Sequence, residues 1–575
     1  MNGLCRLGVT GAILALAGCA ALPPVAEQPA IAEEVVVPQV EQSLPEVALN
    51  AELLYQLLVA EFAVQQGELH LAAQAYLHTA RNTRDPRLAS RATRMAVYAR
   101  DLASALEGAL LWVELEPEQI DAHQSLAALL LRHGRAEEAL PHMRQMLVLA
   151  PRGRTQGFML LANLLAQEGD RQLALALMQQ LVDEHPTEPM AHYALGHLAN
   201  QIGEYPQALQ ALAEALRLEP EQLDALVLKA RVYHAMGQEQ DALDTMAGAM
   251  RMHPRNHQMR MIYARMLVDA QQLSLARAQF RLLHRAEPND ADILYALALL
   301  AMEAGDLDEA EAFFLGLLKL GVRDEEARIA LGQIAQQRQQ FTDAIEWYQS
   351  IDDHAERYMD AQIQAARLIM LHQNLDAALQ YLRGLPLHNQ DDIAQRYLGE
   401  AELLTSAGEY TQAMEVYDEG VALFLSHPNL LYGRALLAER MDRLDQAEAD
   451  LRQILTNDPE HAHALNALGY TLVDRTDRYE EGLQYIERAY RLRPEDAAIL
   501  DSMGWAYFRL GRLQEAESYL RRAYEMMPDA EIGAHLGEVL WAQGKHEEAR
   551  KVWQEAQDIE ADHPVLRDTL QRLQP

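Results

Sequence analysis

Residues 189–220 read PMAHYALGHLANQIGEYPQALQALAEALRLEP, and this stretch contains the pattern that decides the fold. Apolar residues recur at helical spacing over Met190–Gln201 and again over Tyr205–Leu218, which predicts two amphipathic helices. Gly203 lies between them and suits the left-handed conformation that ends many helices. Pro206 suits the first turn of the second helix, where a missing N–H leaves no hydrogen bond unmade. The stretch therefore predicts a helix–turn–helix unit.

The same unit recurs along the chain with a period of 34 residues. A small residue at Ala208 lets the two helices of one unit approach closely, and Pro220 ends the second helix. The small residue occurs fifteen times, always 33 to 35 residues after the previous one, which predicts a stack of about fifteen identical units. Its positions are Ala72, Ala105, Ala139, Ala174, Ala208, Ala242, Ala276, Ala310, Ala344, Ala378, Ala413, Ala447, Gly482, Ala516 and Ala549.

This pattern resembles the tetratricopeptide repeat (TPR). In the first unit the resemblance is carried by Leu195, Gly196, Ala208, Ala215 and Pro220, with Tyr205 at the turn. It implies an all-α fold, a TPR superhelical solenoid of about fifteen helix–turn–helix units. An amphipathic segment at residues 565–573 is expected to form a C-terminal helix that caps the last unit. Such arrays are binding scaffolds with many clients, so the resemblance predicts a fold more sharply than a function.

Composition narrows the class of partner. The chain has 575 residues and a net charge of −36, with 85 acidic and 49 basic residues, of which only four are lysines. An acidic surface disfavours nucleic acid and favours basic or neutral protein clients. The simpler interpretation is that the acidic helix faces are merely solvated.

The first residues have the features of a targeting signal. Arg6 precedes an apolar stretch over residues 7–17 that is too short to span a bilayer. Leu16-Ala17-Gly18-Cys19 resembles the lipobox of bacterial lipoproteins, which implies cleavage before Cys19 and acylation of its thiol and amine. Ala20 follows instead of Asp, and by the enterobacterial sorting rule this implies the periplasmic face of the outer membrane. The alternative is an ordinary secretory signal with a chance cysteine.

The chain divides into five predicted segments. Residues 1–18 are the signal peptide, and residues 19–49 are the lipidated cysteine with a Pro- and Glu-rich linker that stays disordered. Residues 50–320 form an N-terminal repeat array, and residues 429–575 form a C-terminal array with its cap. Between them, residues 321–428 keep the period but lack the proline twelve residues after the marker, and a long loop is expected over Gly384–Asp392. These irregular repeats are a candidate hinge.

One basic patch interrupts the acidic sequence. It consists of Arg81, Arg84, Arg87, Arg91, Arg94 and Arg100. We expect these arginines to pair with glutamates of the first helix; the alternative is a contact with lipid phosphate or an acidic client.

The sequence contains no motif that indicates catalysis or metal binding. The sequence has no phosphate-binding Gly-rich loop and no His-Glu-x-x-His metal motif. His461 and His463 are two residues apart, which directs them away from each other on a helix, so a helix start is the better interpretation. The sequence therefore predicts no catalytic residue, no metal site, no cofactor and no small-molecule substrate. The protein is not expected to be an enzyme.

The TPR resemblance instead implies a concave groove lined by the first helix of each unit. The side chains expected in this groove are Tyr193, His197, Arg231, Arg265, Tyr295, Tyr432, Asn466, Tyr470, Trp505, Phe508 and Trp541. The aromatic residues of the last four units recur at 38, 38 and 33 residues, close to the period, and predict a rail of aromatic surface for an extended or helical client. The alternative is that these rings pack between neighbouring repeats.

Three C-terminal segments and two N-terminal segments carry a closer resemblance, to TPR lipoproteins of proteobacteria. The segments are Leu465–Tyr470, Asp501–Trp505, His535–Trp541, Leu57–Phe62 and Thr83–Arg87. The best-understood member of that group is the outer-membrane lipoprotein partner of a periplasmic carboxy-terminal processing protease. The resemblance implies a non-catalytic adaptor that binds and activates such a protease and presents substrates such as peptidoglycan hydrolases. The alternative is an assembly lipoprotein for a polysaccharide exporter or a pilus secretin.

Overall fold

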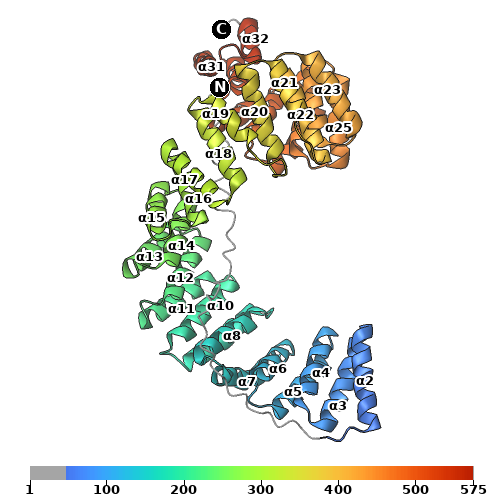
Figure 1. The fold of residues 1–575 in the computed structure, drawn as a ribbon, viewed down its shortest axis with the longest axis vertical. Helices are drawn as coiled ribbons and strands as arrows, with labels where there is room; N and C mark the ends of the chain where they lie inside the picture. The colour runs from blue at the N-terminus through green and yellow to red at the C-terminus, as the bar shows by residue number, and fades with distance from the viewer. Residues whose placement is uncertain (1–46, 574–575) are drawn as a thin grey trace. The chain divides into compact units, whose positions relative to one another are not determined.

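The computed structural model describes residues 47–573, which contain 31 α-helices and no strand (Figure 1). The described residues fall into two compact units, one ending at Gly305 and the other beginning at Asp306. The predicted signal peptide, Cys19 and most of the predicted linker lie outside the described residues. The segment boundaries predicted at residues 320 and 428 stay predictions.

The first unit consists of helices α2 to α16. Their bounds are α2 (Ala51–Gln66), α3 (Leu69–Thr83), α4 (Pro86–Tyr98), α5 (Leu102–Leu115), α6 (Ile120–Arg132), α7 (Ala136–Leu149), α8 (Arg154–Ala166), α9 (Arg171–Asp183), α10 (Pro189–Gln201), α11 (Tyr205–Leu218), α12 (Leu223–Ala235), α13 (Glu239–Met252), α14 (His257–Asp269), α15 (Leu273–Ala286) and α16 (Ala291–Glu303).

The second unit consists of helices α17 to α32. Their bounds are α17 (Leu307–Leu320), α18 (Asp324–Gln337), α19 (Phe341–Gln349), α20 (Tyr358–His372), α21 (Leu375–Arg383), α22 (Gln390–Ser406), α23 (Tyr410–Leu423), α24 (Pro428–Arg440), α25 (Leu444–Asn457), α26 (Ala462–Arg475), α27 (Tyr479–Leu492), α28 (Ala497–Arg509), α29 (Leu513–Met526), α30 (Ala530–Ala542), α31 (His546–Ile559) and α32 (Pro564–Leu573).

Short turns join successive helices as the sequence predicts. Gly203 follows α10 with φ of 83°, in the left-handed region that a residue without Cβ enters without strain. Gln271 takes the same role in a later repeat, with φ of 57°. Pro206 lies in the first turn of α11. The turn chemistry inferred from the repeat is therefore confirmed.

The repeating small residue lies where the helices of a hairpin touch. All fourteen marker alanines are at most 1% exposed, and Gly482 is buried as well. In the α10–α11 hairpin, a Cβ on Gly196 would lie 3.3 Å from the carbonyl oxygen of Ala208 and 2.8 Å from Leu212. Contacts this short leave no room for larger side chains, which explains the periodic ladder in the sequence.

The repeats around residue 350 are irregular in a specific way. Helices α19 and α21 have nine residues each, whereas the second helices of neighbouring hairpins, such as α23 and α25, have 14. Loops 350–357 and 384–389 replace the missing turns. The loop expected over Gly384–Asp392 is shorter than predicted, because the Asn389 side chain accepts a hydrogen bond from the Asp392 N–H at 2.8 Å and starts α22 at Gln390.

Helix α32 confirms the predicted C-terminal cap. It packs on α30, and its Leu566 is fully buried. The Arg572 guanidinium donates to Glu538 Oε2 of α30 at 2.6 Å. The helix therefore covers the last repeat, whose side would otherwise face water.

Among the described helices, none combines the length and the apolar character that a membrane crossing requires.

The basic patch is held mainly by ion pairs. Arg91 pairs with Glu61 of α2, as expected. Arg84 pairs with Glu114 of α5 at 2.7 Å, and Arg81 pairs with Glu107 of the same helix. The expectation that these two arginines pair with the first helix is therefore wrong, because both have their carboxylate partners on α5. The side chains of all these pairs are about half exposed, so each contributes no more than about 1 kcal/mol.

Candidate functional site

The side chains predicted to line the binding face all lie on the first helix of a hairpin. In the repeat of residues 189–220, Tyr193 and His197 lie on α10, and their ring centroids are 6.2 Å apart. Burial, together with the charge of Asp224, raises the pKa of Tyr193 to about 12, and Arg231 of α12 opposes this shift. Burial lowers the pKa of His197, which favours a neutral imidazole. Both rings are half-buried, and Arg231 is exposed.

The remaining predicted positions are spread along both units. Arg265 on α14 and Tyr295 on α16 are half-buried, as are Tyr432 on α24 and Asn466 on α26. The structure does not gather these four side chains into one site. The last three hairpins, by contrast, bring several predicted residues into contact.

A buried charged cluster lies at the centre of those hairpins. His535 of α30 is 1% exposed, and its Nδ1 lies 3.0 and 3.1 Å from the two carboxylate oxygens of Asp501 on α28. The Trp505 ring stacks on His535 with a centroid distance of 4.1 Å and an interplanar angle of 22°. The Trp505 Nε1–H donates to Asp474 Oδ1 at 3.0 Å. The His535 imidazole thus ties α30 to α28, and the Trp505 indole ties α28 to α26.

The charge state of this cluster follows from its surroundings. Burial by itself lowers the pKa of His535, but the nearby carboxylates of Asp501, Glu531 and Asp474 outweigh it and raise the pKa to about 9. The imidazole is therefore protonated at neutral pH. Burial raises the pKa of Glu531, whose Oε1 accepts a hydrogen bond from the Tyr470 hydroxyl at 3.1 Å. The cluster thus holds a buried cation paired with the carboxylate of Asp501.

The aromatic residues near this cluster pack instead of forming an open surface. Trp505 is 7% exposed, and Phe508 covers it with a centroid distance of 5.1 Å. Trp541 packs against Trp553 of α31 at 5.7 Å. The prediction that the aromatic rings are exposed is therefore wrong for Trp505, which packs between neighbouring repeats. Tyr432, Tyr470, Phe508 and Trp541 are half-buried.

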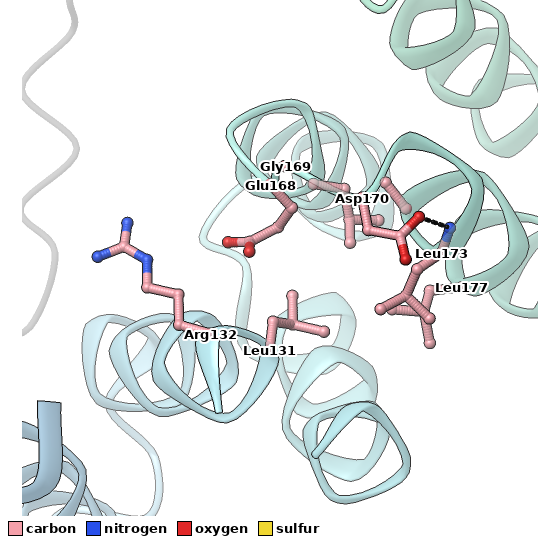
Figure 2. Close-up of a pocket in the computed structure, with 9 residues that line it drawn as sticks. Leu131, Arg132, Glu168, Gly169, Asp170, Leu173 and Leu177 are labelled. Carbon is pink, nitrogen blue, oxygen red and sulfur yellow. Dashed lines mark hydrogen bonds between the residues drawn. The ribbon is translucent and has the colours of Figure 1, made fainter. Parts of the chain in front are cut away.

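A pocket of about 310 Å³ opens in the first unit, between the end of α6 and the turn that leads into α9. Figure 2 shows the Glu168 carboxylate and the Arg132 side chain at this pocket, with Leu131, Leu173 and Leu177 supplying apolar walls. Burial raises the pKa of Glu168, although Arg132 partly offsets the shift. None of the predicted site residues lines this pocket. The lining offers a carboxylate, a guanidinium and apolar walls.

An exposed apolar face on α2 escaped the sequence analysis. Four large side chains are open to solvent on this helix: Leu54 at 45%, Tyr55 at 61%, Leu58 at 47% and Phe62 at 60%. We call these four residues the α2 face. Helical spacing assigns Leu53, Leu54, Leu57 and Leu58 to one side of the helix, but only Leu53 and Leu57 turn toward α3 and become half-buried. No helix precedes α2 in the described residues, so nothing there covers the other side.

Comparison with known proteins is consistent with this architecture. Family models described as tetratricopeptide repeat match residues 159–222, 201–266, 264–324, 295–361, 460–529 and 502–564. A TPR repeat-containing protein of Pseudomonas aeruginosa is 39% identical over 494 residues, which cover 85% of this chain and 83% of that protein. Human tetratricopeptide repeat protein 7B is 27% identical over 186 residues, 32% of this chain and 18% of that protein.

Solved structures with similar folds include a TPR protein of Thermus thermophilus and the Naa15/Naa10 complex bound to HypK-THB. The first is 21% identical with a TM-score of 0.29, and it covers 32% of this chain and 100% of that chain. The second is 13% identical with a TM-score of 0.35, and it covers 91% of this chain and 96% of that chain.

Proposed function

Because the chain belongs to the tetratricopeptide repeat family, we propose that it is a membrane-anchored adaptor that binds and activates a periplasmic carboxy-terminal processing protease. Proteins built from these repeats generally act as non-catalytic scaffolds for protein–protein contacts. The adaptor presents protein substrates such as peptidoglycan hydrolases to the protease. The protein itself has no catalytic role in this proposal.

The α2 face is the observation that carries the proposal. The outer side of a terminal repeat is ordinarily polar, since it faces water. At the C-terminal end, α32 covers the last repeat, and Leu566 is fully buried under it. At the N-terminal end, α2 leaves Leu54, Tyr55, Leu58 and Phe62 exposed. Contiguous exposed apolar side chains of this kind mark a docking surface, because burying them against a partner is favourable.

The charge of α2 points to a protein partner. The helix reads AELLYQLLVAEFAVQQ and contains Glu52 and Glu61 but no Lys or Arg. An anionic lipid surface attracts basic segments and disfavours acidic ones. Aromatic side chains such as Tyr55 and Phe62 are, by contrast, common anchors in protein interfaces. The occupant we assign is therefore an apolar surface of the protease.

The proposal also includes a membrane anchor, the lipid on Cys19. A lipid on Cys19 holds the protein at the periplasmic face of the outer membrane, and several acyl chains give stable attachment. The linker up to residue 49 is about thirty residues long and reaches at most about 100 Å when extended. The repeats can then meet a periplasmic protease while the lipid stays in the membrane.

Paired variants test the α2 face. We expect Tyr55→Ser combined with Phe62→Ser to weaken binding of the purified processing protease by about 30-fold or more, which is the magnitude of an interface hot spot. Leu423→Ser combined with Leu425→Ser is the matched control, because these side chains are 62% and 68% exposed on the second unit. Affinity is measured by calorimetry and helical content by circular dichroism. Equal affinity of the α2 variant and the wild type would contradict the assignment.

A further inference from the structure

Two loops of the second unit bring together three metal-ligating side chains. Asp353 and His354 lie in loop 350–357, between α19 and α20, and His388 lies in loop 384–389, between α21 and α22. Ligand atoms of these three residues all lie within 4.8 Å of one another. The two imidazole rings have a centroid distance of 4.2 Å. Both loops connect one hairpin to the next, so the cluster joins successive hairpins of the irregular repeats.

One carboxylate serves both histidines. His354 Nδ1 lies 2.7 Å from Asp353 Oδ1, and His388 Nε2 lies 3.0 Å from Asp353 Oδ2. Two imidazole nitrogens and a carboxylate thus converge on one point. Each oxygen of the Asp353 carboxylate has one imidazole nitrogen beside it. A divalent cation at that point would bond to all three groups, because neutral imidazole and carboxylate are both metal ligands.

The surroundings hold the cluster in place and add negative charge. The backbone N–H of His354 donates to Asp352 Oδ1 at 2.9 Å, and the backbone N–H of His388 donates to Asp392 Oδ2 at 2.9 Å. The backbone at each histidine is therefore held by a nearby aspartate, Asp352 in the same loop for His354 and Asp392 at the start of α22 for His388. Asp352 Oδ1 also lies 3.8 Å from His354 Nδ1, which places a second carboxylate within reach.

We propose that Asp353, His354 and His388 bind one divalent transition-metal ion, and that Zn²⁺ fits the site best. Two imidazoles and one carboxylate are a common zinc ligand set, with a fourth position left for water. Calcium and magnesium prefer oxygen ligands throughout, so two histidines disfavour them. The site is accessible, because the side chains of His354 and His388 are 73% and 37% exposed.

The position of the site suggests its role. The helices before the two loops, α19 and α21, are the shortened ones, and the proline that follows the marker alanine by twelve residues in regular repeats is replaced here by Glu356 and Gln390. A metal ion would link the loops on the two sides of the α20–α21 hairpin. It would fix that hairpin against its neighbours where helix packing is least regular. This inference does not rest on the proposed adaptor function.

Calorimetry with ZnCl₂ on the full chain, purified without a histidine tag, tests the site. The wild type is expected to bind one Zn²⁺ tightly. His388→Ala should weaken that binding by at least about 100-fold, because losing a direct ligand costs no less affinity than losing an outer-shell partner. His257→Ala is the matched control, because His257 also pairs with one carboxylate, Glu287 at 2.9 Å, but belongs to no group of three metal-ligating side chains in the described part of the chain. Circular dichroism checks that each variant is folded, and Asp353→Asn provides a second ligand variant.

A spectroscopic readout separates a built site from weak surface binding. The chain has 21 histidines and 85 acidic residues, which bind metal ions loosely at many places. Co²⁺ held by two imidazoles and a carboxylate in tetrahedral geometry gives visible absorption that scattered surface binding does not. We expect this absorption in the wild type and in His257→Ala but not in His388→Ala or Asp353→Asn. Absence of the absorption from the wild type, or its persistence in both ligand variants, would overturn the proposal.

Discussion

At the scale of single residues, the C-terminal hairpins depend on a buried cation. His535 is fully enclosed, yet the surrounding carboxylates keep it charged and raise its pKa to about 9. A buried ion pair is tolerated when each member has its partner and becomes costly when one member is removed. Asp501 bonds to the imidazole, and Trp505 covers it. The stability of α28 and α30 should therefore depend on the protonation of one side chain.

The pH dependence of this stability has a definite sign. The pKa of His535 is about 9 in the folded protein and about 6.5 in an unfolded chain, so the folded state binds the proton more tightly. The stabilisation is fully present below about pH 6.5 and is lost as pH rises through about 9, with a total on the order of 3 kcal/mol. Hydrogen exchange of α28 and α30 should accelerate beyond the intrinsic pH effect between pH 7 and 9.5. Asp501→Asn should abolish this extra acceleration, and an identical pH profile in the variant would contradict the account.

At the scale of elements, each hairpin is held by a close crossing of two helices. At the α26–α27 crossing, glycine occurs on both helices, and a Cβ on Gly482 would lie 2.6 Å from the carbonyl oxygen of Gly469. A Cβ on Gly469 would lie 2.7 Å from the carbonyl oxygen of Gly482 and 2.5 Å from Ile486. Backbone cannot move away as a flexible side chain can. This explains why Gly482 replaces alanine at the one exceptional position of the marker series.

Two alanine substitutions with opposite expected signs test this packing. Gly469→Ala should destabilise the hairpin by about 1–3 kcal/mol, because overpacking forces the helices apart. Gly248→Ala on α13 should be neutral or stabilising by up to about 1 kcal/mol, since its nearest neighbour to an added Cβ is the Arg251 guanidinium at 3.7 Å. The measurement is the midpoint of thermal unfolding for each full-length variant. Equal shifts in the two variants would show that the crossing distance does not limit the hairpin.

Sequence reasoning predicted the elements well, because the repeat signal is local. Gly203, Pro206 and the marker alanines act within one hairpin, so their spacing alone indicates two helices and a turn. The exposure of a side chain, by contrast, depends on which other helices pack against it. Trp505 is buried because His535 of the next hairpin stacks on its ring, and Phe62 is exposed because no helix precedes α2 in the described residues.

The metal cluster was missed for a related reason. Sequence motifs for metal sites join ligands on one helix or one short loop. Asp353 and His354 are separated from His388 by a complete helical hairpin, and the loops meet only because successive repeats stack. The period itself is the signal that could have found them, since residues one period apart occupy equivalent places in neighbouring units.

At the scale of the whole molecule, we propose that different parts of the chain attach the protein to the membrane and bind its partners. The repeat arrays supply the binding surfaces, and Cys19 supplies the anchor in our proposal. Replacing Cys19 by Ser removes the thiol that receives the lipid. We expect Cys19→Ser to move the protein from the membrane fraction to the soluble periplasm, as measured by fractionation and immunoblotting. Sedimentation of the variant with membranes would show that the lipid is not the anchor.

The most direct test of the central claim is to identify what the protein holds in the cell. The full-length protein is crosslinked in intact cells, recovered from membranes and examined by mass spectrometry, with the Tyr55→Ser and Phe62→Ser double variant alongside. The account predicts that the wild type brings down a carboxy-terminal processing protease together with cell-wall hydrolases, and that the variant loses the protease. Recovery of only secretin or polysaccharide-exporter subunits with the wild type would contradict it.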